Sequence, residues 1–147
     1  MGVLRACHAA DLSGREFREF CMKQLGKLDG FDWSGVYRLE GQHLVLDAFV
    51  GAPTEHTRIP VGQGVCGTAV AEDRDQIIED VSKLENYLSC SLETKSEAVV
   101  LIKRDGATLG QIDVDGHKVG AFRADEVRLL EQMAGLIAER WEPAAQP

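Results

Sequence analysis

The chain has 147 residues and a formal net charge of −8, with 44% hydrophobic and 27% charged residues. This length suits one globular domain with its own hydrophobic core. The acidity, with lysines and arginines scattered along the sequence, argues against nucleic acid as a partner. No apolar run approaches the roughly twenty residues that cross a bilayer, and the first ten residues lack the pattern of a signal peptide. We therefore expect a cytoplasmic protein without a membrane segment.

The first half of the chain predicts one helix and one hairpin. Residues 13–28 carry apolar side chains at helical spacing, which is typical of an amphipathic helix packed on a core. Residues 33–39 and 43–49 are strand-like runs, and the short polar segment between them indicates a hairpin. The following segment, 51–67, is rich in glycine and proline, which favours an ordered but irregular loop.

The second half predicts a short helix, further strands and a long final helix. We expect the short helix at 67–71, strands at 76–81, 98–103 and 108–114, and the final helix at 125–141. This order predicts an α+β fold, with one central antiparallel sheet and the N- and C-terminal helices packed on one face. We expect a single domain over 1–147, with flexible ends at 1–10 and 142–147.

The four cysteines are Cys7, Cys21, Cys66 and Cys90. A cytoplasmic protein rarely holds a structural disulfide, so we expect thiols. Cys21 falls on the apolar face of the first helix and is expected in the core. Cys66 and Cys90 lie in glycine- or serine-rich segments instead. Because a helix is expected to begin directly after Cys66, the amides at its N-terminus should lower the pKa of that thiol and make it a better nucleophile.

Several short motifs resemble, in combination and in order, those of one known family. They are Arg58-Ile59-Pro60, Gly64-Val65-Cys66-Gly67-Thr68-Ala69, Asp80-Val81, Cys90, Ser96-Glu97 and Asp113-Val114-Asp115. The strand Trp33-Ser34-Gly35-Val36-Tyr37 adds to this set. From about residue 33 to the last helix, the chain resembles the GAF domains of the free methionine-(R)-sulfoxide reductase family.

The resemblance implies a GAF-type fold and a thiol-dependent oxidoreductase that reduces free methionine sulfoxide in a small pocket. Cys90 matches the family's nucleophile, which attacks the sulfoxide sulfur. The family's carboxylates are matched by Glu97, Asp113 and Asp115. Packed together, such acids should raise the pKa of at least one of them, which leaves a proton donor for the departing oxygen. The remaining charge could hold the amino group of a free amino acid.

The resemblance also implies a redox cycle. Trp33 and Tyr37 would form an aromatic wall against the S-methyl group. Attack converts the nucleophile to a sulfenic acid, which a second thiol resolves to a disulfide, and Cys66 is the candidate for this role. A thioredoxin-like reductant would restore both thiols, and the cycle requires no cofactor. The first and last helices could pair two chains in a homodimer.

Two further interpretations remain open. His56 stands where the family usually carries its main resolving cysteine. His56, Cys66 and Cys90 could bind zinc, iron or copper, which would make the chain a metal-dependent GAF enzyme acting on a small molecule. The chain could instead be a GAF module that senses a small molecule without catalysis. The sequence shows no output domain or long signalling helix, so we rank the reductase first and the sensor third.

Overall fold

The computed structural model describes residues 2–84 and 93–144. Its helices are α1 (Gly2–Ala9), α2 (Gly14–Leu25), α3 (Gly64–Glu72), the short 3-10 helix η1 (Val81–Lys83) and α4 (Ala124–Glu139). Its strands are β1 (Trp33–Glu40), β2 (His43–Val50), β3 (Arg58–Pro60), β4 (Gln76–Ile78), β5 (Ser96–Arg104) and β6 (Ala107–Gly116). Within these ranges, no helix has the length and apolar character needed to cross a membrane.

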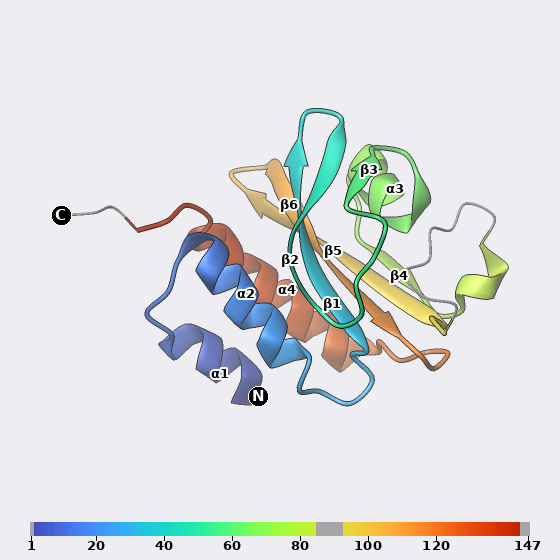
Figure 1. Cartoon of the computed structure of the whole chain (residues 1–147), viewed down its shortest axis with the longest axis horizontal. Coiled ribbons are helices and arrows are strands. Elements are labelled where there is room, and N and C mark those ends of the chain that lie inside the picture. Colours follow the sequence, from blue (N-terminus) through green and yellow to red (C-terminus); the bar gives the residue numbers. More distant parts are fainter. Residues whose placement is uncertain (1, 85–92, 145–147) are drawn as a thin grey trace.

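The strands form one antiparallel sheet with the order β3-β2-β1-β6-β5-β4. Helices α1, α2 and α4 lie along one face of this sheet, and α3 packs on the other (Figure 1). The α+β architecture expected from the sequence is therefore confirmed, including the placement of the first and last helices on the same face.

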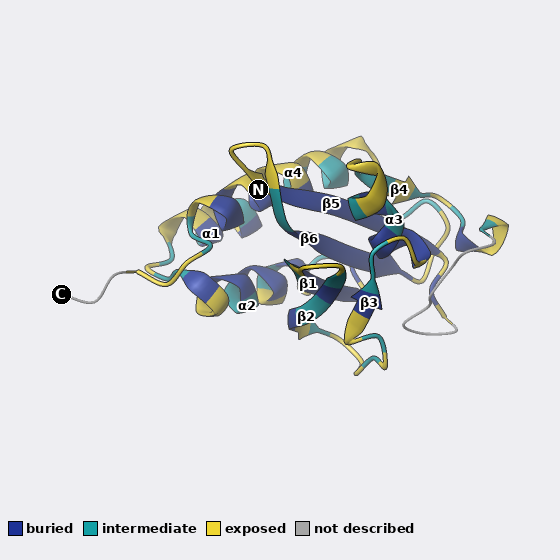
Figure 2. Ribbon diagram, turned by 90° about the horizontal axis from the view of Figure 1, so that it is seen from above, coloured by how far each residue is buried: buried dark blue, intermediate teal, exposed yellow. Residues whose placement is uncertain are grey.

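Strand β6 divides its side chains between the two faces of the sheet. Ile112 and Val114 are fully buried against the helices. Because alternate residues of a strand point to opposite faces, Gln111, Asp113 and Asp115 point to the face that carries α3. All three are almost completely buried, and Figure 2 shows the central strands β5 and β6 as buried along most of their length. One strand therefore supplies both the apolar core and polar groups for a site.

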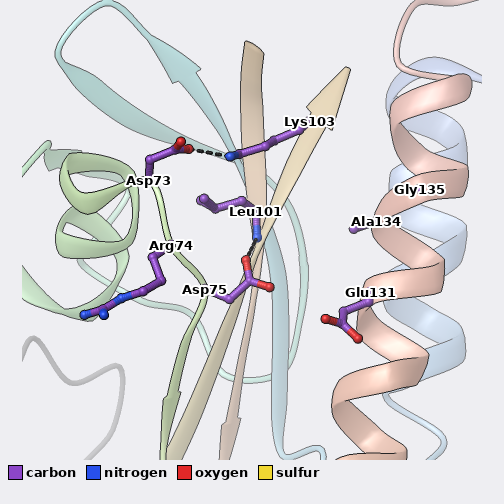
Figure 3. A pocket seen from close by; sticks show the side chains of 8 residues that line it. All are labelled: Asp73, Arg74, Asp75, Leu101, Lys103, Glu131, Ala134 and Gly135. Carbon is purple, nitrogen blue, oxygen red and sulfur yellow. Dashed lines mark hydrogen bonds and ion pairs between the residues drawn. The ribbon is translucent and has the colours of Figure 1, made fainter. Parts of the chain in front are cut away.

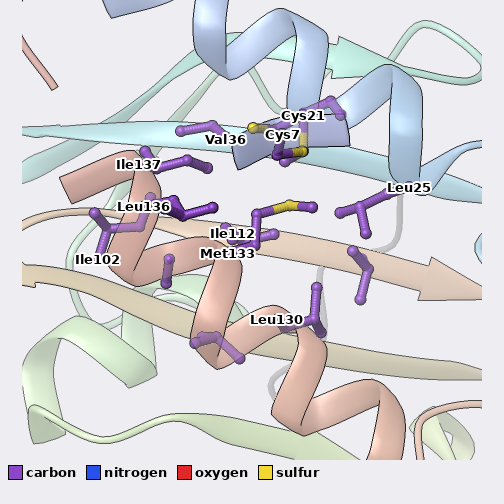
Figure 4. Packing of buried hydrophobic residues seen from close by; sticks show 14 of the residues in the cluster. Cys7, Cys21, Leu25, Val36, Ile102, Ile112, Leu130, Met133, Leu136 and Ile137 are labelled. Atoms are coloured by element: carbon purple, nitrogen blue, oxygen red, sulfur yellow. The ribbon is translucent and has the colours of Figure 1, made fainter. Parts of the chain in front are cut away.

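The larger hydrophobic core lies between the sheet and α1, α2 and α4. Figure 4 shows Met133 of α4 packed in this core near Leu25 of α2. The side chains of Cys7 and Cys21 meet here and share a hydrogen bond, and both are fully buried. The expectation of a core position for Cys21 is confirmed.

The N-terminal segment differs from its expectation. Residues 2–9 form helix α1 rather than a flexible end, because Val3 and Cys7 are buried in the larger core. The guanidinium of Arg140, just after α4, donates hydrogen bonds to three carbonyl oxygens near the C-terminal end of α1, those of Cys7, His8 and Ala10. At the other end of the chain, residues 142–144 follow α4 without regular structure, and residues 145–147 lie outside the described ranges.

A buried ion pair joins α2 to β2. The guanidinium of Arg18 donates to one carboxylate oxygen of Asp47, and Arg38 donates to the other at 2.9 Å. Arg18 also lies over the ring of Trp141, with its central carbon 4.3 Å from the ring centroid. Arg18 and Asp47 are less than a tenth exposed, so each charge depends on the other to offset its loss of hydration.

The expected strands of both hairpins form, with bounds shifted by one or two residues. Two other elements depart more from the sequence expectation. The strand expected at 76–81 ends at Ile78, and η1 begins at Val81. Helix α3 begins at Gly64 rather than at 67, and it therefore includes Cys66. This second difference changes the environment of the thiol.

Candidate functional site

A small cavity lies between α3 and the sheet. Its walls include Tyr37 of β1, His56 before β3, Cys66 of α3, Glu97 of β5 and Asp113 of β6. Its volume of about 10 Å³ leaves room for about one water molecule. A thiol and two carboxyl groups thus meet in a space that is almost closed to solvent.

The register of three neighbouring strands gathers the predicted acids. Glu97 of β5 lies opposite Asp115 of β6, and Asp115 lies opposite Trp33 of β1. Asp113, two residues before Asp115, shares its face of the sheet. All three acids are at most 3% exposed. The structure therefore brings the three predicted carboxyl groups together beneath α3.

Cys66 enters the cavity from the first turn of α3. Its Sγ atom donates a hydrogen bond to Oε2 of Glu97 at 3.9 Å. The helix can begin here because Gly67 packs directly on the preceding chain. A Cβ atom at position 67 would lie 2.6 Å from the carbonyl oxygen of Pro60, which is too close for any other residue. The glycines around Cys66 thus place its thiol over the acids of β5 and β6.

The pKa of the Cys66 thiol is raised well above its usual value. Burial is the main cause, and the charges of Asp113 and Glu97 add to it because they disfavour a thiolate. The expectation of a lowered pKa is therefore wrong. Cys66 does not precede the helix in an open loop but lies inside it, with its side chain directed to buried acids. At neutral pH, Cys66 is a thiol.

Burial also raises the pKa of Asp113, although hydrogen bonds with Glu97 and Cys66 act in the opposite direction. The sequence predicted a raised pKa for at least one of the acids, and Asp113 has it. Its main cause is the loss of hydration rather than repulsion between charges. Among the described residues, Oδ1 of Asp113 has no hydrogen-bond partner. Such a carboxyl group keeps its proton to a higher pH than an ordinary aspartate does.

The two predicted aromatic residues occupy different positions on β1. Tyr37 borders the cavity, and its hydroxyl donates to the carbonyl oxygen of His56 at 2.7 Å, which fixes the segment before β3. Trp33 stacks on Phe49 with 5.8 Å between ring centroids, and its Nε1 donates to the carbonyl oxygen of Ala52 at 2.9 Å. Both are buried, but only Tyr37 is among the described residues that line the cavity.

His56 borders the same cavity as Cys66, as the sequence-based metal hypothesis requires. Within the described ranges, however, the group of metal-type ligand atoms within 4.8 Å of one another belongs to Cys66, Glu97 and Asp113. This group does not include His56. Cys90, the predicted nucleophile and third metal ligand, lies outside the described residues.

Gln111 belongs to the site and was missed from the sequence. Its side chain is completely buried, and its Nε2 donates to the carbonyl oxygen of Cys66 at 3.0 Å. Gln111 has the same parity along β6 as Asp113 and Asp115, and this parity is the signal that could have identified it. The hydrogen bond ties the first turn of α3 to the central sheet.

A larger depression lies apart from this cavity, between the segment that joins α3 to β4 and helix α4 (Figure 3). Its volume is about 440 Å³. Lys103 and Asp73 form an ion pair here, and Oδ1 of Asp75 accepts a hydrogen bond from the Leu101 amide at 2.8 Å. Its described lining contains neither a thiol nor an imidazole. The smaller cavity, by contrast, is lined by a thiol, an imidazole and two carboxyl groups.

Comparison with known proteins gives consistent matches. The sequence matches the GAF domain family over residues 14–142. A protein of Escherichia coli K12 named free methionine-R-sulfoxide reductase is 37% identical over 111 residues, which are 76% of this chain and 67% of that protein. The type II free methionine-R-sulfoxide reductase of Thermoplasma acidophilum has a TM-score of 0.83 and 31% identity, covering 95% of this chain and 94% of that one. The Staphylococcus aureus fRMsr in complex with its substrate has a TM-score of 0.85 and 30% identity, with the same coverage.

Proposed function

This chain belongs to the GAF domain family, among the free methionine-(R)-sulfoxide reductases, and on that premise we propose that it reduces free methionine-(R)-sulfoxide to methionine. The observation that carries the proposal is the contact of the buried Cys66 thiol with Glu97 and Asp113. Sulfoxide reduction consumes two thiols and yields a thioether, a disulfide and water. A site for it needs a thiol, an acid and shelter from bulk water.

We assign the attack on the sulfoxide sulfur to Cys90. In this step the sulfoxide oxygen passes to the Cys90 sulfur, which becomes a sulfenic acid, while methionine is released. The Cys66 sulfur then attacks the sulfenic sulfur, and a disulfide and water form. A thioredoxin-like dithiol reduces this disulfide by exchange. Cys66 suits this second, resolving step because it lies inside the cavity as a protonated thiol.

The acids around Cys66 supply the remaining requirements. Asp113 is the candidate proton donor to the sulfoxide oxygen, because burial raises its pKa. Glu97 and Asp115 provide the negative charge that the ammonium group of a free amino acid would balance. Tyr37 contributes an aromatic surface at the cavity wall. A cavity of about 10 Å³ cannot hold an amino acid, so the residues around it must move when substrate enters.

The test is turnover with separated epimers. Reduced protein is incubated with thioredoxin, thioredoxin reductase and NADPH, and NADPH consumption is followed with the R or the S epimer of free methionine sulfoxide. We expect oxidation of NADPH with the R epimer alone, and none with peptide-bound methionine sulfoxide. Absence of turnover with both epimers would reject the proposal.

Cysteine variants assign the two steps. Cys66→Ser should form about one equivalent of methionine per chain and then stop, since a sulfenic acid on Cys90 forms but is not resolved. Cys90→Ser should form none. Cys21→Ala is the matched control, because Cys21 lies in the larger core on the opposite face of the sheet. Sustained turnover by Cys66→Ser would show that Cys66 is not the resolving thiol.

A further inference from the structure

The thiol and two carboxyl groups of the cavity form a compact set of potential metal ligands. One ligand atom each from Cys66, Glu97 and Asp113 lies within 4.8 Å of the other two. The three residues come from α3, β5 and β6, so the packing of the helix on the sheet fixes their arrangement. None of them is more than 5% exposed. The set is therefore held together without a loop that must first fold around an ion.

The spacing between the sulfur and the Glu97 oxygen is close to that around a zinc ion. Zinc binds sulfur at about 2.3 Å and carboxylate oxygen at about 2.1 Å, so tetrahedral ligands of these types lie about 3.6 Å apart. The observed separation between Sγ of Cys66 and Oε2 of Glu97 is 3.9 Å. This pair is therefore only about 0.3 Å wider than in a tetrahedral zinc site, the Asp113 oxygen lies within 4.8 Å of both atoms, and the cavity has room for one small ion.

A second observation points to a cation at this place. Oδ1 of Asp113 is buried and has no hydrogen-bond partner among the described residues, although buried polar atoms are normally paired. The described lining of the cavity also contains no lysine or arginine to balance its acids. A cation bound between Asp113 and Glu97 would satisfy both the free oxygen and the local charge.

We propose that Cys66, Glu97 and Asp113 bind one Zn²⁺ ion in the reduced protein and that this ion inhibits the reductase. A thiolate ligand favours zinc over magnesium or calcium, which prefer oxygen ligands alone. On binding, the Cys66 thiol and any protonated carboxyl group release their protons to solvent, and the metal keeps its oxidation state. The bound ion then coordinates the Cys66 sulfur, which is therefore not free to attack the sulfenic acid on Cys90. Binding stands independently of the proposed function, whereas inhibition rests on it.

This site differs from the one that the sequence suggested. It uses Glu97 and Asp113 in place of His56 and Cys90, and it requires no residue outside the described ranges. Its ion competes with catalysis instead of performing it.

Direct binding is measured on metal-free, reduced, full-length protein. Zn²⁺ is titrated in the presence of a chromophoric chelator, and Co²⁺ serves as a spectroscopic probe because thiolate ligation gives a sulfur-to-cobalt charge-transfer band. We expect one ion per chain. Cys66→Ser should abolish the cobalt band, and Asp113→Asn or Glu97→Gln should weaken zinc binding by at least about tenfold. The controls Glu139→Gln, at an exposed position, and His56→Ala should bind as the wild type does.

The outcomes separate this site from the alternatives. Retention of the cobalt band by Cys66→Ser, or its loss only in His56→Ala, would overturn the proposal. Inhibition is measured by mass spectrometry as the Cys66–Cys90 disulfide formed in a single turnover by zinc-loaded and metal-free protein, with no added thiol that could remove the metal. Zinc binding by a protein that lacks reductase activity would leave the site standing and reject the proposed function. Full activity of the zinc-loaded protein would overturn the inhibition.

Discussion

Nε2 of Gln111 donates a hydrogen bond to the main-chain carbonyl of Cys66 at 3.0 Å, across the interface between β6 and α3. Gln111 is thus a positioning residue for the thiol. Gln111→Met keeps the size of the side chain but removes the donor. It also removes Oε1, which has no partner among the described residues, so the free energy of unfolding should change by less than about 1.5 kcal/mol.

Activity should respond more strongly than stability in Gln111→Met. The first turn of α3 loses its tie to the sheet, so resolution by Cys66 should slow by about tenfold or more while methionine formation in the first turnover is retained. The two rates are separated by quenched single-turnover assays and mass spectrometry of the disulfide, with thermal melting as the stability check. An unchanged rate of disulfide formation would show that this hydrogen bond does not position Cys66.

Asp113→Asn should stabilise the protein at neutral pH while lowering its activity. The pKa of Asp113 is higher in the folded chain than its usual value, so its contribution to stability is full below the unfolded pKa and is lost as pH rises through the folded pKa. Asparagine has the same shape but does not titrate. The melting temperature of the variant relative to the wild type should therefore increase as pH rises from about 4, the usual pKa of an aspartate, through its higher pKa in the folded chain. Asp11→Asn, at an exposed position, is the control and should show no such trend.

The Cys66 thiol should react slowly with alkylating reagents at neutral pH, because the thiolate is the reactive form and burial and nearby acids disfavour it. Peptide mapping after iodoacetamide treatment measures the rate for each cysteine. Glu97→Gln removes one of the charges that raise the pKa of Cys66, so this variant should be alkylated faster at position 66 than the wild type. Fast alkylation of Cys66 in the wild type at pH 7 would contradict the raised pKa.

Asp47→Ala should destabilise the fold without changing the chemistry of the site. It leaves the buried guanidinium of Arg18 without its carboxylate, which costs about 3–5 kcal/mol when a buried charge loses its partner. Glu40→Ala is the contrasting control, since its partially exposed pair with Arg38 should contribute at most about 1 kcal/mol. Urea denaturation measures both, and activity per folded molecule should equal that of the wild type. If Asp47→Ala lowered the free energy of unfolding by less than about 1 kcal/mol, solvent would have to reach Arg18.

The sheet and the two long helices were predictable because their apolar residues recur with the periods of strand and helix. Helix α1 was not, since it is only eight residues long and depends on Arg140, far away in sequence. The start of α3 was misplaced because Gly64 and Gly67 resemble helix breakers. In the fold, Gly64 takes a positive φ of 64° at the start of the helix, and Gly67 permits close packing.

The sequence predicted which residues lie at the site better than it predicted the direction of their pKa shifts. The motifs around Cys66, Glu97 and Asp113 identified the members, and alternation along β6 placed Asp113 and Asp115 on one face. The direction of the Cys66 pKa could not be found from local sequence, because it depends on burial and on acids supplied by β5 and β6. Gln111 was overlooked because its role is a contact with the main chain of a distant helix.

The alternation of β6 has a consequence for how the chain folds. A slip of one residue against β1 or β5 would turn Gln111, Asp113 and Asp115 into the helix-covered core and expose Ile112 and Val114 to the opposite face. Three polar groups would then be buried without the partners they have now, at a cost that hydrophobic packing could not recover. Burial of these three side chains costs free energy in the native fold, but it costs more in the register shifted by one residue. The polar residues of β6 that line the candidate site therefore also favour correct pairing of the strand.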